Sequence, residues 1–265
     1  MKRRELMKLL VGAAAPLKGL LIVLALASPA LSQASREEGA SIAAEAKDAA
    51  TRFQAYLDGV LKEDGRPDFS KPPAAGLLDQ VLNLKQLEPL PPAQAADLPW
   101  LMEWAGTANG VLKSIMFFGI APPVTLQTDP AALQRNVTEY EDQEAAVSNF
   151  MLRISAREIK AAFAFMSELA PAQRTRVRIE GLNKMRAAEA ELVRNDLGWI
   201  AGMKPANARL VSAAIRDTGA VFATAILPAD RPTILAMLDQ VQAVVKDEET
   251  RDNLSAFGEL LKKAK

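Results

Sequence analysis

The chain has 265 residues with equal numbers of basic and acidic side chains, 32 of each, and it contains no cysteine and no histidine. These two absences exclude disulfide bonds, thiolate nucleophiles, lipid-modified cysteines, zinc-ribbon and iron–sulfur sites, imidazole metal ligands and catalysis by a histidine base. What remains is binding, a structural role, or an enzyme built on carboxylate, Lys, Arg, Tyr or Ser chemistry.

The first 34 residues have a pattern typical of a signal peptide. A basic region is followed by an uninterrupted apolar run, Gly19–Ala27, and then by the small residues Ser32 and Ala34, after which we expect cleavage. The apolar segment after Lys18 is shorter than the roughly 20 residues that a membrane-spanning helix needs. We therefore predict an exported protein. The alternative is a chain anchored in the inner membrane by the uncleaved segment.

Two export routes fit the basic region. Residues 3–8, Arg-Arg-Glu-Leu-Met-Lys, resemble a twin-arginine export motif, whereas translation from Met7 would leave an ordinary Sec signal. Either route leads to the periplasm or an equivalent extracytoplasmic space. Cleavage removes five basic residues and one acidic residue, which leaves 27 basic and 31 acidic residues, a net charge of −4. Such a chain has no general attraction for nucleic acid, and we expect membrane contact only through the signal segment before cleavage.

The first part of the mature chain predicts two helices separated by proline-containing segments. Apolar residues recur at alternating +3 and +4 steps over 36–62, and a shorter helix is expected over 77–87. Segments 64–75 and 88–92 cannot continue a helix, because proline lacks an N–H and restricts the residue before it. We therefore divide the chain into a signal peptide (1–34), an N-terminal helical arm with Pro-rich linkers (35–92) and a helical bundle (93–265).

The most apolar segment of the mature chain, 98–120, predicts a helix in the middle of a bundle. The next helix has a start signal at Asp129, followed by proline, and extends to Leu169. Its heptad phase breaks between Ile154 and Ile159, which predicts a kink or a change of packing partner.

A short turn leads into a second long helix that ends near Met203, and the short connection makes the two helices an antiparallel hairpin. The residues expected to face inward on this second helix are Leu182, Met185, Leu192, Trp199 and Met203. Three further helices are expected over 207–226, 233–245 and 248–263. The predicted fold class is all-α: a multi-helix bundle built around a long antiparallel hairpin, with an N-terminal helical arm.

Three carboxylates, Glu144, Glu158 and Glu189, lie on or beside the apolar stripe of the hairpin. Inward carboxylates build di-iron sites in helical bundles, but those sites also need a histidine on two helices, and the chain has none. We therefore expect each carboxylate to be partly exposed through its long stem, or paired with an arginine such as Arg178 or Arg186.

A basic run opens the second hairpin helix, with Arg174, Arg176 and Arg178 followed by Lys184 and Arg186. Alternate residues point about 200° apart on a helix, so these side chains form no compact patch. A solvated helix start is favoured over a phosphate, lipid-headgroup or acidic-partner site. Positive charge in a first turn nevertheless opposes the helix dipole, which indicates that another group binds these arginines.

Four aromatic residues are candidate ligand-binding residues: Trp100, Trp104, Tyr140 and Trp199. Tryptophans one turn apart, with a tyrosine hydroxyl as polar handle, can line an apolar pocket, and the alternative is that they are simply core.

Binding is the function that these residues favour. We predict an exported, non-catalytic helical protein that binds a partner protein, associates with itself or acts in envelope assembly. The alternative is a binder of an apolar small molecule or lipid in the bundle interior, and a carboxylate-based enzyme comes third. We predict no catalytic residue, no metal and no cofactor.

Overall fold

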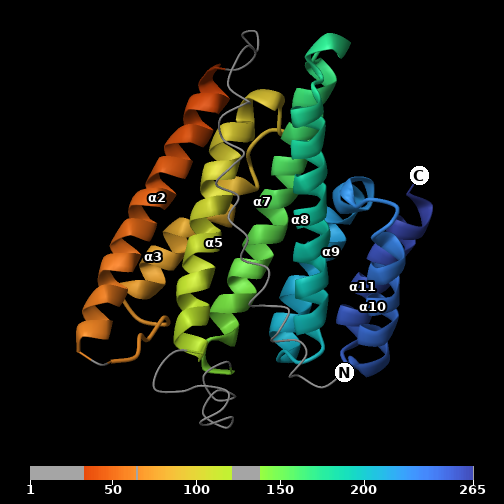
Figure 1. The fold of residues 1–265 in the computed structure, drawn as a ribbon. Coiled ribbons are helices and arrows are strands. Elements are labelled where there is room, and N and C mark those ends of the chain that lie inside the picture. Colours follow the sequence, from red (N-terminus) through yellow and green to blue (C-terminus); the bar gives the residue numbers. More distant parts are fainter. Residues whose placement is uncertain (1–32, 64, 121–137, 265) are drawn as a thin grey trace. The chain divides into compact units, whose positions relative to one another are not determined.

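The computed structural model describes residues 33–63, 65–120 and 138–264, and in these ranges it contains helices and connecting segments without a strand (Figure 1). The predicted fold class, an all-α bundle with a long antiparallel hairpin, is confirmed. The chain forms two compact units. The N-terminal unit comprises residues 32–92 and 100–154, and the C-terminal unit comprises residues 93–99 and those from 155 onward.

The N-terminal unit begins with α2 (Gln33–Lys62), which packs on α3 (Ala74–Val81). Five of the residues that the +3/+4 pattern places on one face of α2 are buried: Ile42, Ala46, Ala49, Phe53 and Leu57. The single helix predicted over 77–87 is instead two, α3 and the short α4 (Leu84–Leu87). The break falls at Asn83, whose side chain accepts a hydrogen bond from the backbone N–H of Gln86 and so starts a new helix.

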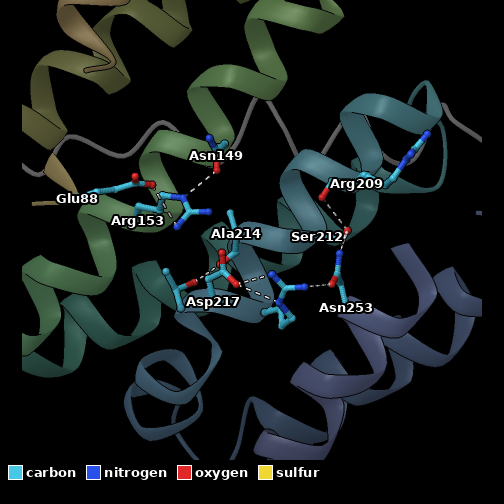
Figure 2. A network of polar contacts seen from close by, with 10 residues as sticks. Glu88, Asn149, Arg153, Arg209, Ser212, Ala214, Asp217 and Asn253 are labelled. Atoms are coloured by element: carbon cyan, nitrogen blue, oxygen red, sulfur yellow. Dashed lines mark hydrogen bonds and ion pairs between the residues drawn. The ribbon is translucent and has the colours of Figure 1, made fainter. Parts of the chain in front are cut away.

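Aromatic side chains fill the interior of the N-terminal unit beside α5 (Leu98–Ile120). Phe69 packs against Phe53, Phe118 and Tyr140 with ring centroids 5.0–6.2 Å apart. At the surface of this unit, the guanidinium of Arg153 contacts Glu88 and Asn149 (Figure 2).

The helix α7 (Glu141–Glu168) belongs to both units, and the boundary lies between Ile154 and Ser155. This is the step at which the heptad phase predicts a change of packing partner. The start signal at Asp129 lies outside the described residues. Within them, α7 begins at Glu141, directly after a bend at Tyr140.

The C-terminal unit contains two 3-10 turns, η2 (Ala95–Asp97) and η3 (Pro171–Gln173), the second half of α7, and four further helices: α8 (Arg176–Ile200), α9 (Pro205–Ala225), α10 (Arg231–Val244) and α11 (Glu248–Lys263). α9 packs on α8 and α11, and α10 also packs on both. Gly219 lets α9 approach α11 closely, because a Cβ there would lie 3.0 Å from Leu260 and from Phe257. Nearby, Asn253 of α11 donates to Ser212 of α9 over 3.1 Å (Figure 2).

The buried face of α8 differs from the predicted one. Met185 is buried, but Leu182, Leu192, Trp199 and the following Met203 are only half-buried. The residues that α8 buries are Gly181, Met185, Glu189, Ala190, Val193, Asp196, Leu197 and Ile200. Two carboxylates and a glycine lie on this face, so the apolar residues alone indicate the wrong stripe of the helix.

None of the described helices combines the length and apolar character needed to span a membrane. Residues 1–32 of the signal segment lie outside the described residues, and its removal and the division at residue 92 stay predictions.

Candidate functional site

The hairpin buries its three carboxylates, contrary to the expectation of partial exposure. Glu144 is 2%, Glu158 7% and Glu189 5% exposed. No lysine or arginine among the described residues forms an ion pair with any of them; Arg178 and Arg186 instead bind backbone carbonyls. Since charged groups are almost never buried unpaired, these carboxyls are the most unusual groups in the described structure.

Glu158 and Glu189 form a pair inside the C-terminal unit, one on α7 and the other on α8. The Ser155 hydroxyl donates a hydrogen bond to Glu189, and the second oxygen of Glu189, Oε2, is buried without a hydrogen-bond partner. Burial raises the pKa of Glu158 to about 7. Burial raises the pKa of Glu189 well above its ordinary value, and the negative charge of Glu158 raises it further, against the bond from Ser155.

Glu144 lies in the N-terminal unit and is a separate case. Burial, and after it the charge of Glu141, raise the pKa of Glu144 to about 8. Its Oε2 is also buried without a hydrogen-bond partner. This carboxyl is therefore largely protonated at neutral pH, when it can donate as well as accept a hydrogen bond.

Such groups can hold protons at neutral pH, which is the property expected of a general acid or a proton-binding site. In the described part of the chain, no group of three or more Asp and Glu residues is arranged to hold a metal ion.

The predicted aromatic residues are divided between the two units. In the N-terminal unit, Trp100 and Trp104 are 6% and 0% exposed, with ring centroids 6.5 Å apart. The Trp104 indole N–H donates to the carbonyl of Val81 over 2.7 Å, and its ring lies 5.1 Å from that of Phe150. Both tryptophans thus pack against other side chains, and Trp104 closes the C-terminal end of α3.

Tyr140 lies in the same unit, 2% exposed, and its hydroxyl bonds the carbonyl of Pro67 and the guanidinium of Arg66. Burial raises its pKa. Trp199 lies in the C-terminal unit and is half-buried. A role for these four residues in ligand binding stays a prediction.

A shallow groove of about 430 Å³ lies in the N-terminal unit between α2 and segment 85–91. Glu38 and Glu45 stand on its α2 wall, Lys85 faces them, and none of the predicted aromatic residues lines it.

The arginines of the basic run hold the turn of the hairpin. Arg174 donates to the carbonyls of Leu169 and Ser167 at the end of α7, over 3.0 and 3.1 Å. Arg178 donates to the carbonyl of Gln173 and stacks 5.9 Å from the ring centroid of Phe165. These contacts supply the partners that the unfavourable dipole indicated: Arg174 caps the carbonyl end of α7, and Arg178 binds the last carbonyl of η3.

The hairpin tip, residues 167–180, reaches past the rest of the C-terminal unit. Arg186 donates to the carbonyl of Ala225, the last residue of α9, so the first ten residues of α8 extend beyond that helix by about 15 Å. Val177 and Ile179 on the tip are 60% and 45% exposed. In Figure 1 the turn between α7 and α8 projects past the ends of α9, α10 and α11.

Comparison of the chain with protein-family models, with curated proteins and with solved structures finds no match, so the geometry alone carries the functional proposal.

Proposed function

We propose that the mature chain is an exported, non-catalytic protein of the cell envelope that acts by binding a partner protein, and that the hairpin tip is its contact surface. The supporting observation is the exposure of Val177 and Ile179 on an element that extends past its neighbours. Exposed apolar side chains that lie near one another mark candidate interaction sites, whereas apolar side chains exposed singly need no explanation.

The charge of the tip indicates the kind of partner. Three basic and two acidic residues lie on the tip, a net charge of +1 on a mature chain of net −4. The Arg176 side chain is 90% exposed even though it is paired with Glu180. Because Arg174 and Arg178 are held by carbonyls, the tip presents its positive charge in a fixed arrangement, which favours an acidic partner surface.

Site-specific photo-cross-linking in living cells tests this proposal. A photoreactive residue in place of Val177 is compared with one in place of Val244, which lies on α10 and is also 60% exposed. We expect a cross-linked adduct with an envelope protein from Val177 that is absent from Val244. Adducts of equal yield from both positions, or none from Val177, would contradict the proposal.

The proposed export has its own test. N-terminal sequencing of the protein recovered from the periplasmic fraction should begin at Ser35. A chain that keeps Gly19–Ala27 and sediments with membranes would mean an anchored protein instead.

A further inference from the structure

We infer that Glu158 and Glu189 form a proton-binding site inside the hairpin, and that loss of the bound proton loosens the pairing of α7 with α8. This inference goes beyond the proposed function and does not depend on it, because it concerns the shaft of the hairpin and not what its tip contacts.

The register of the hairpin places the two carboxyls on facing helices. Ser155 on α7 bonds Glu189 on α8, and Phe165 on α7 lies under Arg178 on α8. From Ser155 to Phe165 the chain advances ten residues along α7, and from Glu189 to Arg178 it goes back eleven residues along α8. Nearly equal steps in opposite directions are what two antiparallel helices require. Glu158 lies one turn after Ser155 on the same face of α7, so its carboxyl is directed to the same level of α8.

The pair contains more negative charge than its surroundings can compensate. If both carboxyls were ionised, two like charges would share an interior site with one hydroxyl as donor, and Oε2 of Glu189 would have no hydrogen-bond partner. Carboxyl pairs in this situation keep one proton between them over a wide pH range. A proton on Glu189 removes the repulsion, because only one of the two carboxyls then carries a charge.

The charged groups of the packed elements do not neutralise the pair. Arg157 on α7 interacts with Asp97, Lys160 is exposed, and on α8 Arg194 pairs with Glu191. The other charged residues on the elements of this unit that pack around the hairpin are Glu168 on α7, Arg176, Arg178, Glu180, Lys184, Arg186 and Asp196 on α8, Arg209, Arg216 and Asp217 on α9, and Arg231 and Asp239 on α10. No cation among them contributes to the pKa of Glu158 or of Glu189.

The sign of the pH effect follows from burial. Because both pKa values are raised in the folded state, the hairpin is most stable below the ordinary pKa of a carboxyl and loses stability as the pH rises toward about 7 and beyond. For each proton involved, the equilibrium constant for opening rises about tenfold per pH unit in that interval.

Distance measurement by paired spin labels tests the inference, and a chain without native cysteine is suited to it. Lys160→Cys on α7 and Lys184→Cys on α8 place labels at two exposed positions that the register brings level with each other. The distance distribution in the full mature protein is recorded at about pH 5.5 and about pH 8.5, on either side of the transition. The labelled protein is compared in three forms. The first keeps the native glutamates, and the second is the double variant Glu158→Gln/Glu189→Gln. The third is the control Glu180→Gln, which changes an exposed carboxylate on α8.

We expect the native and control proteins to show a narrow distribution at the lower pH and a broader, longer one at the higher pH, and the double variant to stay narrow at both. A native distribution that is unchanged between the two pH values would overturn the inference, and so would a double variant that broadens as much as the native protein. If the double variant does not fold, Glu189→Gln alone is compared with the native protein by denaturant unfolding. Its stability must then fall less with rising pH than that of the native protein, and equal falls would refute the proton site.

Discussion

Gly39 is the residue whose substitution tests most directly how tightly the tryptophans are packed. It lies in α2 of the N-terminal unit, and a Cβ at this position would stand 2.5 Å from Cε2 and 2.7 Å from Cζ2 of Trp100. The indole of Trp100 is only 6% exposed and packs against Trp104. A rigid ring in this setting cannot move aside as the end of a flexible side chain could, so Gly39→Ala must displace it.

Two opposing effects set the magnitude. Alanine in place of glycine inside a helix stabilises by about 1 kcal/mol, whereas forcing an extra carbon into a packed core costs about 1–3 kcal/mol. Because the contact distances fall far below van der Waals separation, we expect a cost in the upper half of that range and a net destabilisation of about 1–2 kcal/mol. Gly59 is the matched control: it lies in the same helix, and nothing would lie within 4 Å of its Cβ. Gly59→Ala should therefore stabilise by about 1 kcal/mol.

Guanidinium unfolding followed by circular dichroism and by tryptophan fluorescence measures both variants. We expect opposite signs for the two substitutions and a changed native-state fluorescence for Gly39→Ala alone. If Gly39→Ala stabilises as much as Gly59→Ala, then Trp100 has room to move. The reasoning that places it in close packing would then be refuted, and the apolar-ligand alternative would gain support.

Two further substitutions and one pH dependence follow from single contacts. Trp104→Phe removes the indole N–H that binds the carbonyl of Val81 and should destabilise by about 1–3 kcal/mol in thermal unfolding; an unchanged midpoint would mean that the bond contributes nothing. Arg231→Met leaves three backbone carbonyls without their guanidinium donor and should cost about 2–4 kcal/mol, whereas a loss below about 0.5 kcal/mol would be inconsistent with those bonds. Because the pKa of Glu144 is raised from 4.5 to about 8, its contribution to stability is full below its ordinary pKa and is lost as the pH rises to about 8. In the native protein the stability to urea should fall by up to about 4 kcal/mol between about pH 5 and pH 9 because of this group, and Glu144→Gln should remove that fall. Parallel curves for the two proteins would contradict the raised pKa.

The helices themselves could be predicted where proline or a capping residue ends them. The sequence predicts a helix over 98–120 and another over 248–263, and both have those bounds in the structure. The first lies between two proline-containing segments of the sequence. The second starts directly after Asp247, whose side chain accepts a hydrogen bond from the backbone N–H of Thr250. Local chemistry of this kind depends on a few adjacent residues and needs no tertiary information.

The burial of the carboxylates could not be predicted, because an apolar pattern cannot detect a buried polar residue. On α8 the true inner stripe passes through Gly181, Glu189 and Asp196, and a pattern of large apolar residues shifts to Leu182 and Leu192 beside it. The two stripes differ by a rotation that depends on how the neighbouring helices, among them α9 and α10, pack on α8. The glutamates on the hairpin were recognisable as unusual in the sequence, but the approach of two of them to each other depends on the register of the hairpin.

For the arginines of the tip, the helix dipole predicts an additional partner, whereas the spacing of the residues does not identify that partner. Their alternate spacing predicts that they form no compact patch, and their unfavourable position at a helix start indicates an additional partner. That partner is the carbonyl end of the preceding helix, where Arg174 reaches across the turn to the backbone of Leu169 and of Ser167. A sequence cannot specify this geometry, because the turn conformation decides which carbonyls lie within reach.

Buried carboxyls are poor stabilising elements, since well-packed apolar residues of similar volume would often serve as well or better. Their position in this chain is selective: Glu158, Glu189 and Asp196 all lie on the buried faces of the hairpin, whereas the polar residues that α9 and α11 bury are uncharged. The hairpin is therefore the part of the C-terminal unit whose packing we expect to respond to pH. Elements that bind or move are drawn from the less stable parts of a fold. The buried carboxyls of α8, which make its inner face hard to recognise from the pattern of apolar residues, are therefore also groups through which the hairpin can respond to pH.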